Sequence, residues 1–261
     1  DAIVLFDGKN LDAWGSNNGP AAWEVKDGAM VAAKADLVSK QSFGAIQLHA
    51  EWRAPAGRPV NGQSGGNSGI FLMGLVEVQV LDNHENPTYA DGFANSVYGT
   101  NPPLANPLRP PGEFQQVDII FRRPVYRDGR VVDPGYLTVF CNGVLVQDHT
   151  PLEGPGGHQK RSVAGPFPAQ GPLKLQDHGN PVRFRNIWYR PLPARSVEGG
   201  TDGFLTAEAT TLKRKAIAAT VRADAAKLSG TAQMLRLAES LCYENETVTA
   251  GTVDKMSHDY V

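Results

Sequence analysis

Polar side chains that can take part in acid–base chemistry alternate with apolar ones in two separate segments of the chain. Glu77 and Gln79 stand between valines, and Lys174, Gln176 and His178 recur at every second position further along. Successive side chains of a β-strand point to opposite faces of a sheet, so this spacing predicts two strands that each present a polar face. Carboxylate, amide, amine and imidazole groups together can move protons and bind sugar hydroxyls. These two segments are therefore the first candidates for a functional site.

Two further predicted strands show the same alternation. His49, Glu51 and Arg53 alternate with apolar residues on one of them, and Asp118 does so on the other. If all four strands are neighbours in one sheet, their polar residues line a single groove. The alternative is an ordinary wet face, which antiparallel sheets normally leave toward solvent. Repeated Gln, Glu, His and Asp favour a site, because a plain wet face is richer in Thr, Ser and Lys.

Glu77 and Asp82 are carboxylates five positions apart. Two carboxyl groups that flank a glycosidic bond can act as acid and base or as nucleophile and acid. An odd spacing puts the two on opposite faces of a strand unless a bulge intervenes, which argues against a conventional pair. Glu77, Asp82 or His178 could instead hold a divalent cation, although no compact ligand motif is present. No dinucleotide or phosphate-binding fingerprint occurs, so no organic cofactor is expected.

Composition excludes several classes of partner. The chain has 261 residues, a net charge of −2, 28 glycines and 19 prolines. The two signs of charge are interspersed, which argues against a nucleic-acid partner, and no apolar run approaches the roughly 20 residues of a membrane span. No signal sequence is visible, and the abrupt start at Asp1 suggests a processed mature form. A small neutral partner is expected, and the sequence indicates no oligomeric state.

Residues 1–195 have β character throughout, with many turn dipeptides such as Asn142-Gly143. The predicted strands are Ile3–Phe6, Trp23–Lys26, Ala29–Ala33, Leu37–Ser39, Ala45–Arg53, Ser68–Met73, Val76–Leu81, Gln116–Arg122, Tyr136–Cys141, Val144–Asp148, Leu173–Gln176 and Val182–Arg190. Short strands without helices between them predict an all-β fold, a sandwich or jelly roll of two antiparallel sheets. Three Gly- and Pro-rich stretches, 54–66, 83–115 and 151–171, are long enough to form functional rims.

The composition changes from Leu205 onward, and a second region is predicted at 196–261. Residues 206–228 and 231–244 have helical patterns separated by Ser229-Gly230, so we expect a helical hairpin followed by a polar tail. Cys141 lies in an apolar strand and is predicted to be a buried small hydrophobe.

Six ordered motifs carry a resemblance to a known family. They are Leu5-Phe-Asp-Gly-Lys-Asn-Leu-Asp-Ala-Trp14, Asn67-Ser-Gly-Ile-Phe, Glu77-Val-Gln-Val-Leu-Asp82, Pro111-Gly-Glu-Phe-Gln-Gln-Val-Asp-Ile-Ile120, Asn142-Gly-Val144 and Leu173-Lys-Leu-Gln-Asp-His-Gly-Asn-Pro-Val-Arg-Phe-Arg-Asn-Ile-Trp188. Across roughly residues 2–192 the chain resembles the bacterial 3-keto-disaccharide hydrolases, also described as 3-keto-glucoside lyases and hydratases. The resemblance implies a concanavalin A-like jelly roll, exported to the periplasm or secreted, that acts on a glycoside already oxidised at C3. The helical region lies outside the matching motifs.

The implied chemistry follows from the acidity of the hydrogen at C2 beside a 3-ketone. A base removes that hydrogen, the enolate expels the C1 substituent, and water then adds, which gives net hydrolysis. Under this hypothesis Glu77 or His178 is the base and the other is its acid partner, while Lys174 or a bound divalent metal stabilises the enolate. The side chains expected to orient hydroxyls or support the site are Arg53, Asn67, Gln79, Asp118, Gln176 and Asn186.

Two other functions compete with this one. A retaining glucanase of the same fold would use Glu77 and Asp82, but Gln79 stands where a middle aspartate would be expected. A carbohydrate-binding module without chemistry would rely on an exposed aromatic row, and the four tryptophans are mostly assignable to core positions or strand ends.

Overall fold

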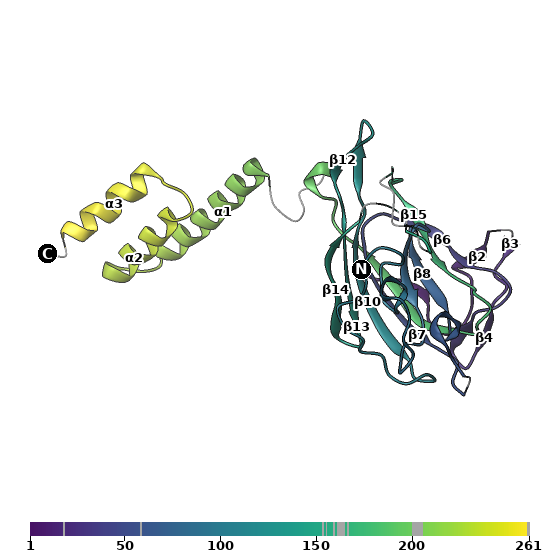
Figure 1. Cartoon of the computed structure of the whole chain (residues 1–261). Coiled ribbons are helices and arrows are strands. Elements are labelled where there is room, and N and C mark those ends of the chain that lie inside the picture. The colour runs from purple at the N-terminus through teal and green to yellow at the C-terminus, as the bar shows by residue number, and fades with distance from the viewer. Residues whose placement is uncertain are drawn as a thin grey trace. The chain divides into compact units, whose positions relative to one another are not determined.

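The computed structural model describes residues 1–259 except 18, 58, 153, 155, 159, 161–164, 166 and 200–205. The chain divides into two compact units, Asp1–Glu198 and Gly199–Val261, and each is described by itself. The boundary predicted from the sequence lies between residues 195 and 196. The first unit is built from strands and the second from helices (Figure 1).

The first unit contains all twelve strands predicted from the sequence, and four short ones that were not predicted. The strands are β1 (Ile3–Phe6), β2 (Trp14–Ser16), β3 (Gly19–Pro20), β4 (Glu24–Lys26), β5 (Ala29–Val31), β6 (Leu37–Phe43), β7 (Ile46–Arg53), β8 (Ser68–Leu72), β9 (Val76–Val80), β10 (Gln115–Arg122), β11 (Val125–Arg127), β12 (Arg130–Asp133), β13 (Tyr136–Cys141), β14 (Val144–Pro151), β15 (Gly171–Leu175) and β16 (Arg183–Pro191). Short 3-10 turns lie at Gly62–Ser64, Ala90–Gly92 and Ser196–Glu198. The unpredicted strands are β2, β3, β11 and β12.

Two antiparallel sheets form a jelly-roll sandwich, as the sequence predicted. Sheet A has eight strands in the order β14-β13-β10-β7-β16-β5-β4, with β1 paired to β16. Sheet B has six strands in the order β3-β2-β6-β15-β8-β9, and β11 and β12 form a separate hairpin. Asn142 and Gly143 adopt positive φ angles of 50° and 81°, which is the geometry of the tight turn that joins β13 to β14.

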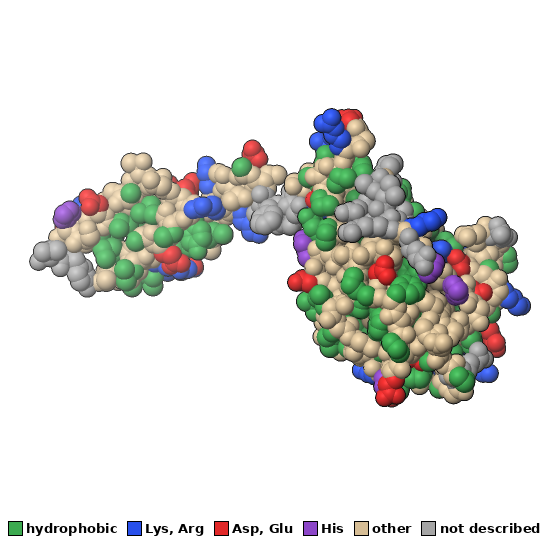
Figure 2. Space-filling view, in the orientation of Figure 1, with side chains coloured by type: hydrophobic (Ala, Val, Ile, Leu, Met, Phe, Trp, Pro, Cys, Tyr) green, Lys and Arg blue, Asp and Glu red, His purple; other side chains and the backbone are tan. Residues whose placement is uncertain are grey.

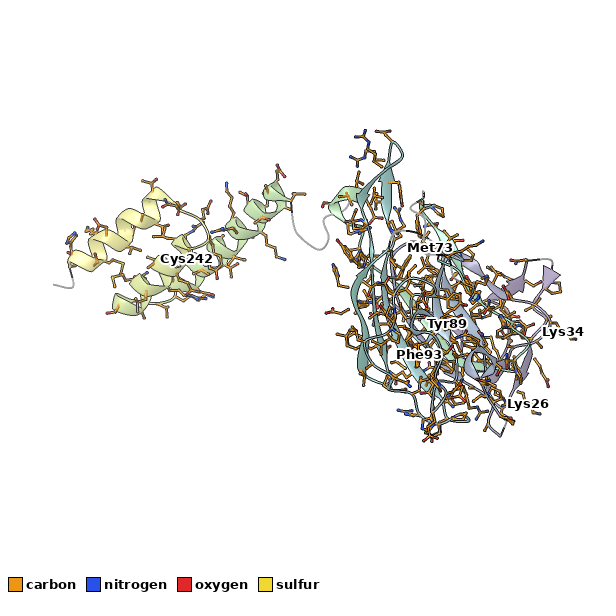
Figure 3. All side chains as sticks on the ribbon, viewed as in Figure 1. Lys26, Lys34, Met73, Tyr89, Phe93 and Cys242 are labelled. Atoms are coloured by element: carbon orange, nitrogen blue, oxygen red, sulfur yellow. The ribbon has the colours of Figure 1, made fainter. Side chains whose placement is uncertain are left out.

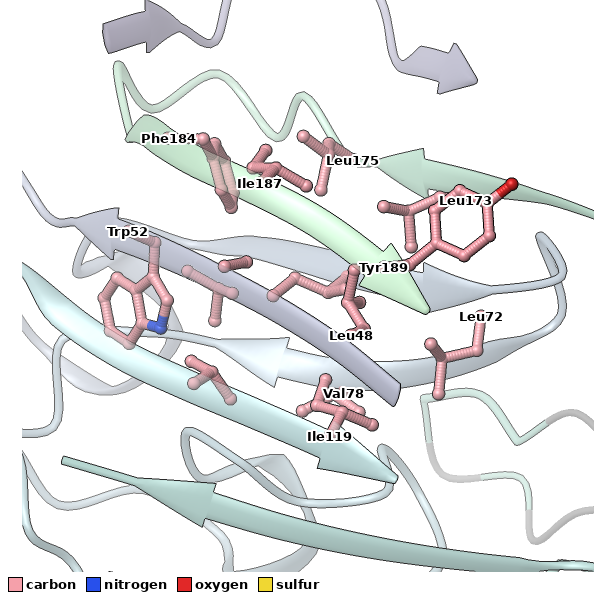
Figure 4. Packing of buried hydrophobic residues seen from close by; sticks show 14 of the residues in the cluster. Leu48, Trp52, Leu72, Val78, Ile119, Leu173, Leu175, Phe184, Ile187 and Tyr189 are labelled. Carbon is pink, nitrogen blue, oxygen red and sulfur yellow. The ribbon is translucent and has the colours of Figure 1, made fainter. Parts of the chain in front are cut away.

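The core lies between the two sheets. Side chains of β7, β10 and β16 meet those of β8, β9 and β15 there (Figure 4). Leu48, Trp52 and Ile119 come from sheet A, while Val78 and Leu175 come from sheet B, and all five are buried. Because strands alternate, burial of these residues turns their neighbours outward, so each sheet has an outer face that carries the polar residues.

The second unit consists of three helices, α1 (Ala207–Ala225), α2 (Gly230–Leu241) and α3 (Thr247–His258). Helices α1 and α2 occupy the two segments for which the sequence has helical patterns, and α3 lies in the segment that was described only as a polar tail. Threonines, valines and a glycine give α3 a weak intrinsic helix propensity, so its stability comes from packing on α2. No described helix combines the length and the apolar character needed to cross a bilayer.

Candidate active site

A row of side chains crosses the outer face of sheet B. The antiparallel register places Lys174 opposite Phe71, and Phe71 opposite Glu77. Val78 forms an isolated bridge with Val97, and the amide of Tyr98 donates to the Glu77 carbonyl at 3.1 Å, so the row continues to Tyr98. Neighbouring strand backbones are about 4.8 Å apart. The backbone of Glu77 is therefore one strand from that of Phe71 and two strands, about 10 Å, from that of Lys174.

Glu77 is the central group of this row. It is partly buried, and burial raises the pKa of its carboxyl to about 7, although the nearby Lys174 ammonium opposes the change. A side chain at Gly69 would collide with the Glu77 carboxylate, so the glycine leaves the space in which that carboxylate lies. A carboxylate with a pKa near 7 is well matched to proton transfer at neutral pH.

Two contacts fix the side chain of Lys174, the last residue of the row. Its ammonium lies 3.2 Å from Oδ2 of Asp36, just before β6, and 3.8 Å from the centroid of the Phe71 ring. A positive charge over the face of an aromatic ring is attracted by the ring quadrupole. The row therefore carries a fixed ammonium group whose positive charge acts on the Glu77 carboxyl.

A second row of polar groups lies beside the first. The backbone N–H of Gln176 donates to the backbone carbonyl of Gly69 at 3.0 Å, and Gly69 is opposite Gln79 in the register of β8 and β9. The side-chain oxygens of both glutamines are buried, and none of the described residues donates a hydrogen bond to them. Buried carbonyl oxygens are normally paired, so two unpaired ones on the same face indicate a place for donors such as sugar hydroxyls or water.

Asn67 supports this second row from the start of β8. Its side-chain nitrogen donates to the backbone oxygen of Gln63 at 3.0 Å, and Gln79 Nε2 donates to Gln63 Oε1 at 3.1 Å. Gln63 in turn donates to the Gly92 carbonyl at 2.9 Å, which ties these groups to the long 83–114 segment. Asn67 and Gln79 therefore lie on the predicted face, and their amide nitrogens are already used within the protein.

Tyr98, which no sequence pattern marked, also lies at this site. Its hydroxyl lies 2.7 Å from that of Tyr89, which Figure 3 labels, and 3.3 Å from Nδ1 of His158. Burial raises the pKa of Tyr98, with smaller contributions from Tyr89 and Glu77, so the phenol stays protonated. Tyr98 belongs to the Gly- and Pro-rich stretch 83–115, which the sequence indicates only as a long loop. Its neighbour Val97 pairs with Val78 in an isolated bridge, and such a bridge produces no alternation of polar and apolar residues in the sequence.

His178 and Asp82 do not join the row. Strand β15 ends at Leu175, and His178 lies beyond it, exposed in the turn before β16. Asp82 is buried, and its Oδ1 accepts the backbone amide of His84 at 3.1 Å, so it braces the start of the 83–114 segment. Among the described residues, no three His, Cys, Asp or Glu side chains gather as a metal ion requires, so Glu77, Asp82 and His178 form no ligand set there.

The remaining predicted residues lie on the outer face of sheet A. His49 Nδ1 lies 2.7 Å from Asp118 Oδ1, and Asn186 Nδ2 lies 3.1 Å from His49 Nε2 and 2.9 Å from Glu51 Oε1. Arg53 extends from the end of the same face of β7. The condition for a single groove, that all four strands are neighbours in one sheet, is therefore not met, because β7 and β10 belong to sheet A whereas β9 and β15 belong to sheet B. Arg53, Asp118 and Asn186 are separated by the core from Glu77.

The imidazole of His49 is enclosed in this second network. Both of its nitrogens have partners, and its ring stacks on Trp188 with centroids 5.1 Å apart. Asn186 has a φ of 47° at a bulge in β16, which turns its amide toward His49. The network is satisfied internally, so sheet B, with its unpaired glutamine oxygens and its perturbed carboxyl, is the better candidate for catalysis.

Fold and site define a jelly-roll sandwich that presents acid–base and amide groups on the outer face of one sheet. The chain belongs to the family described as the 3-keto-alpha-glucoside-1,2-lyase-like domain, whose model matches residues 1–190. The family resemblance inferred from the motifs is thereby confirmed.

Individual relatives agree with the family. A 3-keto-disaccharide hydrolase from Bacteroides thetaiotaomicron is 26% identical over 233 residues, covering 71% of this chain and 76% of the relative. A crystal structure described as a candidate glycosyl hydrolase from Parabacteroides distasonis is 44% identical, with a TM-score of 0.71, and covers 74% of this chain and 84% of that one. A second candidate glycosyl hydrolase from that organism, at 23% identity and a TM-score of 0.55, covers 74% of this chain and 100% of that one and shows the fold alone.

Proposed function

We propose that the chain cleaves 3-keto-glycosides, with net hydrolysis of the bond at C1. The observation that carries this proposal is the Glu77 carboxyl, whose pKa burial raises to about 7 on the polar face of sheet B. The family and the relative named a 3-keto-disaccharide hydrolase support the substrate class. Family resemblance also favours a location outside the cytoplasm.

In the proposed reaction the ionised Glu77 takes the proton from C2, and the electron pair of the C2–H bond forms the enolate of the C3 ketone. The enolate then re-forms the ketone as a C1–C2 double bond forms and the bond from C1 to the leaving oxygen breaks, with a proton going to that oxygen. Water adds at C1 of the resulting 2-hydroxy-glycal, and a proton returns to C2. The sum is one water consumed and one glycosidic bond cleaved.

Other residues of the site have roles in this scheme. The Lys174 ammonium supplies the positive charge that an enolate oxygen needs, and the protonated Tyr98 hydroxyl is a hydrogen-bond donor on the other side of Glu77. The unpaired oxygens of Gln79 and Gln176 accept hydrogen bonds from sugar hydroxyls. His178, which was predicted as a partner of Glu77, lies outside the row and is a weaker candidate for the acid.

The test compares turnover of 3-keto-glucosides with that of the matching unoxidised glucosides, for both anomers and with and without a chelator. We expect turnover of the oxidised sugars only, and a loss of at least about 100-fold in kcat/KM for Glu77→Gln, which is the scale of general base catalysis. The matched control is Glu24→Gln, an exposed position in β4. Turnover restricted to the unoxidised glucosides would overturn the proposal, and binding without turnover of either would point to a carbohydrate-binding module.

A further inference from the structure

A cavity of about 420 Å³ lies at the end of sheet A, away from the row on sheet B. It is formed where β7 ends and β16 begins, and Arg53 and Arg183, which are opposite each other in the register of these strands, both line it. The remaining lining residues are apolar or glycine, among them Val31, Pro55 and Pro181. Among the described residues, the lining thus combines apolar walls with the two cationic side chains of Arg53 and Arg183, and it includes no acidic residue.

Arg53 has no ion-pair partner among the described residues, although its neighbours Arg183 and Arg185 do. Arg183 pairs with the exposed Asp27 at 3.2 Å, and Arg185, further along β16, pairs with Glu51 at 2.6 Å. Burial together with the nearby Arg183 and Arg185 lowers the pKa of Arg53, and the negative charge of Asp27 opposes this change only in part. An arginine keeps its charge in proteins, so the repulsion between these guanidinium groups is relieved when an anion binds between them.

The guanidinium of Arg53 is also held in place. It lies 4.7 Å from the centroid of the Phe114 ring, and its Nη1 donates to the Gly112 carbonyl at 3.5 Å. A guanidinium fixed by stacking loses little conformational entropy when it binds a ligand. Planar arginine donors match the oxygens of a carboxylate or a phosphate better than they match single hydroxyls.

We propose that this cavity binds a small ligand with an oxyanion, a carboxylate or a phosphate, carried on a body that contacts the apolar walls. The anion lies between Arg53 and Arg183, and the body of the ligand rests against Val31 and the two prolines. This site is independent of the proposed cleavage reaction. It also changes the predicted role of Arg53, from orienting a neutral hydroxyl to binding a charged group.

The test measures binding to the full chain by titration calorimetry at constant ionic strength, with sodium glucuronate, inorganic phosphate and glucose as separate probes. Glucuronate and glucose share a sugar ring and differ in charge, whereas phosphate has charge without a ring. We expect glucuronate or phosphate to bind and glucose not to bind, and the comparison of the first two identifies which oxyanion the cavity prefers. Affinity should fall as salt is raised, because added anions compete and screen the arginines.

Ala56 offers a variant that leaves both arginines in place. It is exposed and lines the cavity, so Ala56→Glu adds a competing carboxylate at the mouth, while Ala56→Gln has nearly the same size without charge. We expect Ala56→Glu to weaken anion binding at least tenfold and Ala56→Gln to weaken it less than threefold. Arg53→Met should also lose at least tenfold, whereas the exposed Arg130→Met should bind as the parent does. Equal losses in the Glu and Gln variants, or binding of no anionic probe, would overturn the proposal.

Discussion

Replacing Glu77 by glutamine should stabilise the sandwich at alkaline pH. Burial raises the pKa of the Glu77 carboxyl from 4.5 to about 7. Between these values the folded protein keeps a proton that the unfolded chain has released, so the free energy of unfolding falls as pH rises. A pKa difference of about 2.5 corresponds to about 3 kcal/mol. This is an upper limit for the decrease in the free energy of unfolding, and the decrease is complete once the pH exceeds the folded-state pKa of about 7. Glutamine has no charge at any of these values and escapes this loss.

The measurement is urea unfolding of the parent and of Glu77→Gln at pH 4, 5.5, 7 and 8.5, followed by tryptophan fluorescence. All four tryptophans belong to the sandwich unit, so the signal is not mixed with unfolding of the helices. The difference in unfolding free energy between variant and parent should grow in favour of the variant by up to about 3 kcal/mol from pH 4 to pH 8.5. Glu24→Gln, at an exposed position, should show no such trend.

The trend with pH separates the charge effect from any packing effect of the substitution. A loss of packing would shift the stability of Glu77→Gln by a similar amount at every pH, whereas the carboxylate penalty appears only as Glu77 ionises. A difference between variant and parent that stays constant from pH 4 to pH 8.5 would refute the raised pKa, and with it the match of Glu77 to proton transfer at neutral pH.

Two further predictions concern the same site. Gly69→Ala should lower kcat/KM for a 3-keto-glucoside by at least about tenfold, because the new methyl group displaces the Glu77 carboxylate. The control Gly251→Ala, whose methyl group meets no neighbouring atom, should leave kcat/KM unchanged. Equal activity of the two variants in steady-state kinetics would show that the position of the carboxylate is unimportant. In the parent, kcat/KM should rise with pH through an apparent pKa of about 7, because Glu77 must be ionised to act as the base. A pH profile of kcat/KM that falls over this range would exclude Glu77 as the base.

Much of the fold could be predicted because its signals are local. Alternation marks the strands, and dipeptides such as Asn142-Gly143 mark the tight turns. The same alternation predicted Glu77 and Gln79 on one face of a strand, and β9 has this register, with Glu77 opposite Phe71 and Gln79 opposite Gly69.

The assembly of the site could not be predicted in the same way, because the choice of neighbouring strands is not local. Nothing in the alternation of β7 distinguishes a partner in sheet A from one in sheet B, so Arg53 was grouped with residues that lie across the core. Tyr98 was missed because it reaches Glu77 through one isolated bridge in a long connection. His178 was overrated because the alternation continues past Leu175, where the strand ends.

The central claim, that cleavage begins with removal of the C2 proton, is tested most directly by turnover of a 3-keto-glucoside in D₂O. Early samples of the released 3-keto-glucose are analysed by NMR for deuterium at C2, with 3-keto-glucose and no protein as the control for spontaneous exchange. Elimination followed by hydration predicts that the product carries deuterium at C2 well above this control. A product that retains the original hydrogen at C2 would contradict the account and indicate direct displacement at C1.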